Sequence, residues 1–304
     1  MTREERNQEM HEEIQEEEKK ERRKKWTKRI IKGILFLTVF LTLFFTYTTY
    51  VSTVKIETRE YRIISKKIPD NLNGLKIIQF SDLHYGSTMF QEELQKVIDL
   101  SNERNPDIIV FTGDLISKNY KVSSEEQEEI ITLLKSMKSS LGKYAILGDE
   151  DNESISTIYN QSDFMVLRNE YDLIYKDTNN PILLVGLTSI TKSKEFEKGY
   201  QYFSLEGHNP DIYTITILHE PDTVDEILRS YSSDLFLAGH SHNGNIRVPF
   251  MKFSFIKKEN ARKYDQDYYK IGNSEMYVSS GLGTESGFRL FCRPSINFFR
   301  LSNH

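Results

Sequence analysis

The sequence predicts an α/β domain of layered strands and helices at residues 53–304, preceded by one membrane-spanning helix at residues 30–52. Two observations support this prediction. Short apolar, β-branched runs alternate with polar helical runs between residues 75 and 238, and residues 33–51 contain no charged side chain. One cysteine, 15 Gly and 7 Pro in 304 residues exclude disulfide-stapled, cysteine-based zinc and low-complexity proteins.

Residues 1–29 form a charged arm. Residues 1–18 carry eight Glu and residues 19–29 carry eight Lys or Arg, so apolar positions are too few to build a core. We expect this arm to be helical, solvated and cytoplasmic.

Residues 33–51 are long enough to cross a membrane. At about 1.5 Å per helical residue they cover roughly 28 Å, close to the hydrocarbon thickness of about 30 Å. Their five Thr can return hydroxyls to the helix backbone, and Tyr47 and Tyr50 suit a membrane interface. A buried soluble helix rarely runs this long without a polar face. A cleaved signal peptide is the better alternative, but the run exceeds the usual apolar region of about 7–15 residues and no A-x-A site follows. We expect an uncleaved anchor.

Charge around this span predicts its orientation. The basic half of the arm precedes it, and only Lys55 and Arg59 follow shortly after, so the N-terminus should be cytoplasmic and the domain extracytoplasmic. The domain has more Asp and Glu than Lys and Arg, which disfavours nucleic acid as a partner.

The domain itself shows buried strands alternating with helices. Continuous apolar runs of this length are typical of strands covered on both faces. The expected strands are residues 75–80, 107–112, 143–147, 181–187, 211–218 and 234–238, and the clearest helices are 91–103 and 124–138. The tail differs, because Gly- and Pro-bearing turns separate short runs and predict an antiparallel finish. Its expected strands are residues 276–279, 289–291 and 296–301.

Five of these strands run directly into side chains that can bind a metal. Ligands of open α/β sheets lie beyond the carboxyl ends of the strands, so these loops can converge on one site. Within a strand-like loop, residues two apart point to the same side, which pairs Asp82 with His84 and His240 with His242. In chain order, the residues are Asp82, His84, Asp114, Asp149, Glu150, Asp151, His219, His240 and His242.

Imidazole and carboxylate ligands suit Mn, Zn or Fe better than a thiolate site or a calcium cage. Two metals need a shared ligand, and a carboxylate such as Asp114 can bridge ions about 3.5–4 Å apart. Each signal alone is weak, because an Asp after a strand is usually a helix cap or a turn residue.

Together, in this order, the signals D-x-H, G-D, G-D-E-D, H and G-H-S-H resemble the calcineurin-like metallophosphoesterases, and specifically their single-pass, membrane-anchored bacterial branch. The resemblance covers about residues 55–302. It includes the tail, where residues 277–284 and 289–294 are similar to the closing segment of that branch.

The resemblance implies a four-layer α/β/β/α sandwich with two divalent ions, which hydrolyses phosphate esters or pyrophosphates through a metal-bound hydroxide. It implies that Asp82, His84 and His242 bind the first metal, that His219 and His240 bind the second, and that Asp114 bridges the two. Such a centre would hold the phosphoryl oxygens and lower the pKa of the shared water.

One loop departs from the family pattern, which usually reads Gly-Asn-His-Asp/Glu where this chain has residues 148–151, Gly-Asp-Glu-Asp. Asp149 can still bind the second metal, but it adds negative charge. Glu150 replaces the His that contacts the phosphate and protonates the leaving group, and an ordinary ionised carboxylate would repel phosphate instead. Three outcomes are open: Glu150 turns away or is held protonated by Asp151, the leaving group needs no acid, as in a pyrophosphate, or the chain binds without turnover.

The stretch between the last metal loop and the tail bears on the substrate. It combines the apolar Met251, Phe253 and Phe255 with the basic Lys252, Lys257 and Lys258, which fits either an ordinary β-ribbon or an apolar, basic rim facing the bilayer. The sequence therefore predicts a membrane-anchored two-metal phosphoesterase acting on a phosphorylated substrate, for which a lipid-linked phosphate is one candidate. The alternative is an impaired relative that binds a phosphorylated lipid or wall polymer through the metal site.

Overall fold

A computed structural model describes residues 2–177, 180–190, 211–247, 254 and 256–304. The chain divides into two compact units, Met1–Thr48 and Thr49–His304. Met251, Phe253 and Phe255, predicted to form a rim, lie outside the described residues.

The first unit consists of helix α1, Arg3–Thr46, and the chain continues into a π-helical turn, Tyr47–Val51. Among the described residues, one helix is long and apolar enough to cross a membrane, by length and composition. Its threonines return their hydroxyls to the backbone as predicted, because Thr38, Thr42 and Thr46 each donate to the carbonyl four residues earlier at 2.9–3.0 Å.

The second unit contains two six-stranded sheets. The first has the order β1 (Glu57–Ile64), β12 (Ser295–Ser302), β2 (Lys76–Phe80), β3 (Ile108–Phe111), β4 (Gly142–Ala145) and β5 (Met165–Val166). The second has the order β10 (Tyr268–Ile271), β11 (Ser274–Val278), β9 (Leu235–Ala238), β8 (Thr214–Leu218), β7 (Ile182–Leu187) and β6 (Glu170–Ile174). Strands β2–β5 are parallel, as are β7, β8, β9 and β11.

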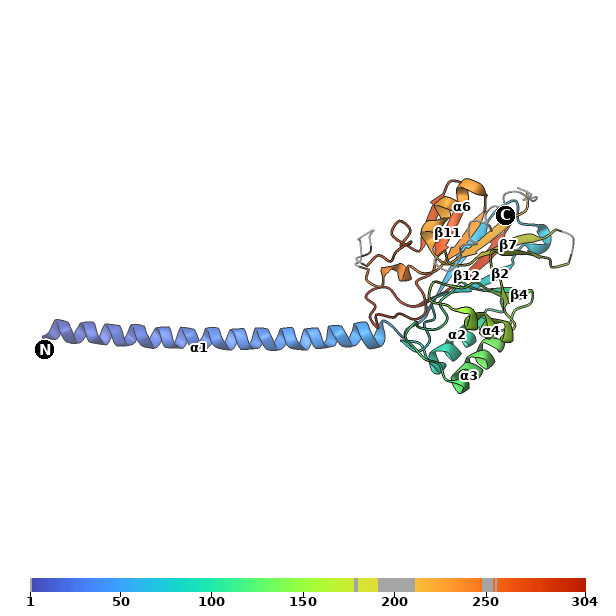
Figure 1. The fold of residues 1–304 in the computed structure, drawn as a ribbon. Coiled ribbons are helices and arrows are strands. Elements are labelled where there is room, and N and C mark those ends of the chain that lie inside the picture. Colours follow the sequence, from blue (N-terminus) through green and yellow to red (C-terminus); the bar gives the residue numbers. More distant parts are fainter. Residues whose placement is uncertain (1, 178–179, 191–210, 248–253, 255) are drawn as a thin grey trace. The chain divides into compact units, whose positions relative to one another are not determined.

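The helices cover the two outer faces of this pair of sheets (Figure 1). They are α2 (Gln91–Glu103), α3 (Ser124–Lys135), α4 (Glu153–Gln161) and the shorter α6 (Val224–Ser230). Ser123 and Glu126 form a capping box that starts α3, and Asn152 caps α4 by accepting the Ser154 N–H at 2.9 Å.

Three buried apolar clusters define the layers. One lies between α2–α4 and the first sheet, the second between the two sheets, and the third between the second sheet and α6. Ile77 and Ile78 show the alternation, since Ile77 faces the other sheet and Ile78 faces the helices. The predicted four-layer α/β/β/α sandwich is thereby confirmed.

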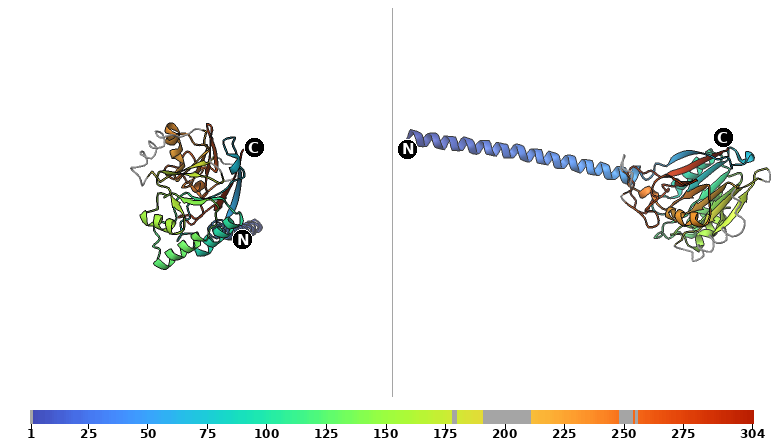
Figure 2. Two further views of the ribbon diagram at one scale, coloured as in Figure 1. Left: turned by 90° about the vertical axis from the view of Figure 1, so that its right-hand side faces the viewer. Right: turned by 90° about the horizontal axis from the view of Figure 1, so that it is seen from above.

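The tail was only partly predicted. Strands β11 and β12 form, but in different sheets, and each pairs parallel to one neighbour and antiparallel to the other. In both views of Figure 2 the red β12 lies beside the blue β1, in line with their parallel pairing. The strand predicted at residues 289–291 is wrong: Leu290 makes a single bridge to Ile246, because Arg289 is drawn into the core and Phe291 adopts a left-handed φ of 53°.

Candidate metal centre

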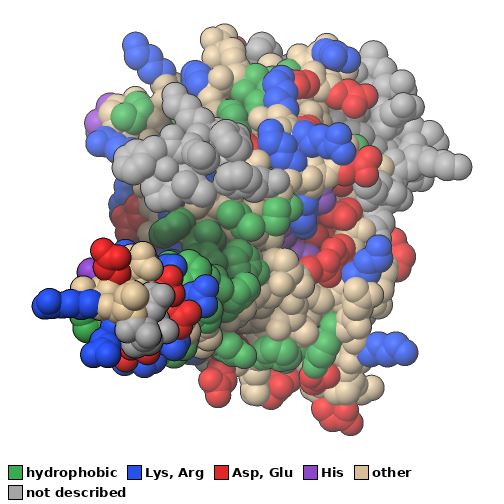
Figure 3. All heavy atoms as spheres, turned by 90° about the vertical axis from the view of Figure 1, so that its left-hand side faces the viewer, with side chains coloured by type: hydrophobic (Ala, Val, Ile, Leu, Met, Phe, Trp, Pro, Cys, Tyr) green, Lys and Arg blue, Asp and Glu red, His purple; other side chains and the backbone are tan. Residues whose placement is uncertain are grey.

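The residues predicted to bind metal converge at the carboxyl ends of the central strands. Two groups of ligand atoms form there, each with all its atoms within 4.8 Å of one another. We name them the inner group, Asp82, His84 and His242, and the outer group, Asp114, Asp149, His219 and His240. Figure 3 shows histidine side chains among acidic ones on one face of the domain.

The inner group is sealed from solvent. The side chains of Asp82 and His84 are 0% exposed and that of His242 is 1% exposed. Nε2 of His84 lies 3.1 Å from Nε2 of His242, and Asp82 Oδ1 lies 3.3 Å from the latter atom. Two imidazole nitrogens and a carboxylate oxygen therefore point at one small volume.

The outer group is partly open. Asp149 Oδ1 lies 2.9 Å from both His219 Nε2 and His240 Nδ1, and the Asp149 side chain is 27% exposed. The opposite ring nitrogens donate to backbone carbonyls, His219 Nδ1 to Thr112 at 2.6 Å and His240 Nε2 to Glu259 at 2.8 Å. These bonds fix the ring orientations, so His219 Nε2 and His240 Nδ1 remain as ligand atoms.

Asp114 lies between the two groups. Its Oδ2 is 3.2 Å from His219 Nε2 and 3.9 Å from His84 Nε2. This buried oxygen accepts no hydrogen bond from the described residues, an arrangement that is costly unless a cation fills the gap. Gly148 permits the close packing, because a Cβ there would lie 2.2 Å from Asp114 Oδ1. The residues fit a pair of divalent ions that share Asp114.

The backbone of the centre is strained. Five non-glycine residues adopt left-handed φ of 44–63°: Asp82, His84, Asp114, His240 and His242. Each left-handed L-residue costs about 1–2 kcal/mol, and such strain clusters at functional sites. The expectation that extended geometry pairs Asp82 with His84 and His240 with His242 is thus wrong in its cause: tight left-handed turns bring these side chains together.

Negative potential dominates the centre. Burial opposes protonation of His219, but the charge of Asp114 and the hydrogen bond to Asp149 outweigh it and raise the pKa of His219 well above its usual value. Burial also opposes protonation of His84, and Glu150 and Asp114 outweigh it, so its pKa is raised too. Potential that binds protons this firmly also favours divalent cations.

Glu150 and Asp151, both predicted as catalytic, have different surroundings. Glu150 Oε2 lies 3.3 Å from His84 Nδ1 and accepts the Lys118 N–H at 3.2 Å. The fully buried Asp151 accepts backbone N–H groups of Gly148, Asp114 and Leu115 at 2.8–2.9 Å, and burial with the Asp114 charge raises its pKa to about 6. Asp151 thus fixes the loop backbone.

Two residues near the centre were missed. Glu285 forms a third group with Glu150 and His84, and burial together with the Glu150 charge raises its pKa. The carboxyl group paired with Glu150 is therefore that of Glu285, whereas the sequence had suggested Asp151 as the carboxyl group that holds Glu150 protonated. Arg289 is fully buried and donates to the carbonyls of Gly283 at 2.6 Å and Ser280 at 2.8 Å, beneath His242.

Comparison with known proteins places the chain. Residues 75–244 match the model of the calcineurin-like phosphoesterase family. The chain belongs to this family and is a metal-dependent phosphoesterase.

Three curated relatives illustrate the range of the family. The chain is 31% identical to the uncharacterized metallophosphoesterase YkuE of Bacillus subtilis, over 84% of this chain and 89% of the relative. It is 25% identical to the phosphodiesterase YaeI of Escherichia coli, over 76% and 84%. It is also 25% identical to the UDP-2,3-diacylglucosamine pyrophosphatase LpxG of Chlamydia muridarum, over 76% and 84%.

Proposed function

We propose that this chain is a membrane-anchored phosphoesterase that uses two divalent ions to cleave a phosphate ester or pyrophosphate bond in a lipid-linked substrate. The proposed parts are the arm at residues 1–29, the anchor at 30–52 and the extracytoplasmic domain at 53–304. One observation carries the lipid substrate: the domain begins at the same edge of the sheet as the candidate metal centre.

Strand directions establish this edge. Because β1 is parallel to β12, and β12 is antiparallel to β2, β1 starts where β2 ends. Arg59 pairs with Asn297, which pairs with Gln79, so Glu57 is level with Ser81, just before Asp82. Two strand spacings of about 4.8 Å separate β1 from β2. The apolar span ends six residues before Glu57, a tether of at most about 20 Å. The chain that follows the proposed span therefore enters the domain at the edge that bears the candidate metal centre.

Side-chain contacts tie the first strand to the centre. Arg59 forms an ion pair with Asp267, and Asp267 accepts from the side chain of Asn243, the neighbour of His242. The segment that leaves the anchor thus contacts a metal loop through two side-chain bonds.

Three exposed apolar side chains lie in segments that also carry or hold residues of the centre. Phe90, Ile256 and Phe291 are 43%, 44% and 57% exposed. Phe90 ends the loop after His84, Ile256 precedes Glu259, whose carbonyl holds His240, and Phe291 precedes Cys292, whose thiol contacts the His242 carbonyl at 3.3 Å. These three residues, the apolar rim, suit insertion into a membrane interface.

The relatives and the charge pattern agree with this reading. The name of the LpxG relative describes a pyrophosphatase of a diacylated sugar nucleotide, and a Danio rerio relative, 26% identical over 72% of this chain, is named a transmembrane protein with a metallophosphoesterase domain. The lysines and arginines at residues 19–29 support a cytoplasmic N-terminus.

The residues of this chain divide the catalytic work. The inner group would hold one ion of Mn, Zn or Fe, the outer group would hold the second, and Asp114 would be shared. Bound ions would draw charge from the phosphoryl oxygens and lower the pKa of the attacking water. Glu150 lies beside His84 and Glu285, so it does not act as an isolated anion that faces the phosphate.

Glu150 also supports the second candidate, a relative that binds a phosphorylated lipid or wall polymer without turnover, because no histidine stands at this position to protonate a leaving group. Hydrolysis of bis-p-nitrophenyl phosphate by the full chain in detergent with Mn²⁺ separates the two. Turnover that Asp114→Asn abolishes supports the enzyme; absence of turnover that Glu150→His restores supports the binder.

The lipid substrate is tested on phosphatidylcholine vesicles that contain a diacylglycerol pyrophosphate. The double variant Ile256→Ser/Phe291→Asn should lower the ratio of vesicle turnover to soluble aryl ester turnover about 10- to 100-fold. The two side chains are about half exposed, so each gains about half of the roughly 1.5–3 kcal/mol of full burial. Tyr175→Ser is the matched control, because Tyr175 is 47% exposed but follows β6 at the opposite edge. An unchanged ratio in the double variant would contradict the bilayer-facing rim.

A further inference from the structure

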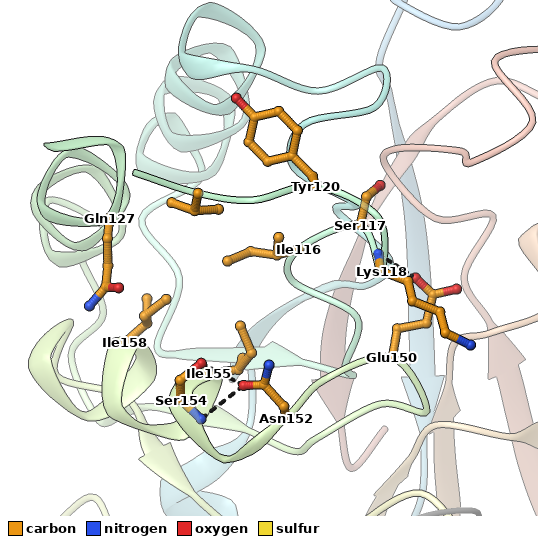
Figure 4. Close-up of a pocket in the computed structure, with 11 residues that line it drawn as sticks. Ile116, Ser117, Lys118, Tyr120, Gln127, Glu150, Asn152, Ser154, Ile155 and Ile158 are labelled. Atoms are coloured by element: carbon orange, nitrogen blue, oxygen red, sulfur yellow. Dashed lines mark hydrogen bonds between the residues drawn. The ribbon is translucent and has the colours of Figure 1, made fainter. Parts of the chain in front are cut away.

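A cavity adjoins the candidate metal centre and shares a wall with it. It has a volume of about 190 Å³ and lies between the segment after β3, helix α3 and the start of α4 (Figure 4). Glu150 is the shared wall, because it lines the cavity and also lies 3.3 Å from His84 Nδ1. The cavity and the metal centre are therefore one side chain apart.

The cavity combines an apolar floor with hydrogen-bonding walls. Ile116, Ile155 and Ile158 form the floor, and Figure 4 places Lys118 beside Glu150. Asn152 Oδ1 is occupied by the Ser154 N–H and hydroxyl, which leaves the Asn152 amide nitrogen to donate. Within the described part of the chain, no ion pair engages the Lys118 ammonium. In Figure 4 the Lys118 side chain extends away from the isoleucines, so the walls present a donor from Asn152 and an acceptor from Glu150.

Charge and size limit the ligand. The Glu150 carboxylate would repel a second phosphate, whereas a hydroxyl can donate to Glu150 and accept from the Asn152 amide. A cavity of about 190 Å³ holds several water molecules, since one water needs about 10–15 Å³ of such space. It is large enough for a glycerol or a single sugar.

We propose that this cavity is a subsite for the hydroxyl-bearing alcohol, of glycerol to single-sugar size, that is linked to the phosphoryl group of the substrate. The inference rests on the proposed function. It adds that the substrate is selected by the uncharged group next to the bond that is cleaved.

Calorimetry on the full chain in detergent with Mn²⁺ tests the subsite, with methyl phosphate and glycerol 3-phosphate as paired ligands. Glycerol 3-phosphate should bind about tenfold more tightly, the gain from one or two hydrogen bonds of about 1 kcal/mol each. Gln127→Trp, which fills the cavity from α3, should abolish this preference and leave the affinity for methyl phosphate unchanged. Glu128→Trp is the control, because Glu128 is the next residue of α3, is exposed and does not line the cavity.

The outcomes separate this inference from the proposed function. Equal affinities for the two phosphates in the parent, or equal weakening of both by Gln127→Trp, would overturn the subsite while the phosphoesterase stands. Failure of methyl phosphate to bind the Mn-loaded parent would overturn the proposed function and the subsite with it. Unchanged Mn²⁺ affinity in both Trp variants shows that they fold.

Discussion

The inner and outer groups of the centre use the same ligand types but differ in their access to solvent. The inner side chains are at most 1% exposed, whereas Asp149 in the outer group is 27% exposed and His240 is 8% exposed. Neighbours support both groups: Asp82 accepts the His240 N–H at 3.0 Å and His84 contacts Glu150 in the inner group, as Thr112 and Glu259 hold the outer histidines. The inner group is therefore expected to hold its ion firmly and the outer group to exchange its ion with solvent.

Asp82→Asn should have the largest effect on the difference in metal affinity between the inner and outer groups. The variant loses a buried anionic ligand and leaves two histidines facing each other. Residues that only hydrogen-bond to a metal ligand typically contribute roughly 10- to 100-fold to metal affinity, so the affinity for the inner ion should fall by more than that. Mn²⁺ titration of the parent and the variant measures the effect. An inner affinity within threefold of the parent (about 0.7 kcal/mol) would show that Asp82 is not a ligand.

Asp149→Asn should act on the outer ion alone. The amide can still bind through its oxygen, but the lost charge should cost about 1.5–3 kcal/mol, or roughly 10- to 100-fold in affinity. Excess Mn²⁺ should restore turnover, because the outer group is open. Mn²⁺ titration of the parent and the variant measures this effect. If the variant lost the more tightly bound ion instead, the outer group would be the tighter site, opposite to the assignment made here.

Glu150→Gln should weaken the inner ion by about tenfold, the lower end for a residue that orients a metal-bound histidine. The outer ion should be unaffected, since the Glu150 side chain contacts His84. The Glu150 contact with Asp114 is made by its backbone N–H at 2.9 Å and is retained in the variant. Co²⁺ absorption spectra report the altered ligand field of His84. Glu153→Gln, on the exposed first turn of α4, is the matched control, and equal spectral changes in both variants would remove this role from Glu150.

The sequence predicted that the residues of the centre converge, but it did not predict the strand and side chains that surround and hold them. Metal-binding residue types at five strand ends were enough, because buried parallel strands bring their carboxyl ends to one edge. Their roles as ligands stay predictions. Strand β1 was missed because it is an edge strand whose charged Glu57, Arg59 and Glu60 mask its buried Ile63.

Glu285 and Arg289 could not be found from local patterns. Both lie in a glycine-bearing turn far along the chain from Glu150 and His242, and only tertiary folding brings them there. The left-handed backbone of five site residues has the same origin, since sequence periodicity carries no signal for it.

Electron paramagnetic resonance of the full chain with two equivalents of Mn²⁺ tests the central claim, two ions joined through Asp114. The parent should give the exchange-coupled spectrum of a manganese pair, and Asp114→Asn should give the six-line spectrum of isolated ions. An uncoupled spectrum in the parent, or coupling that survives in Asp114→Asn, would contradict the two-metal centre described above.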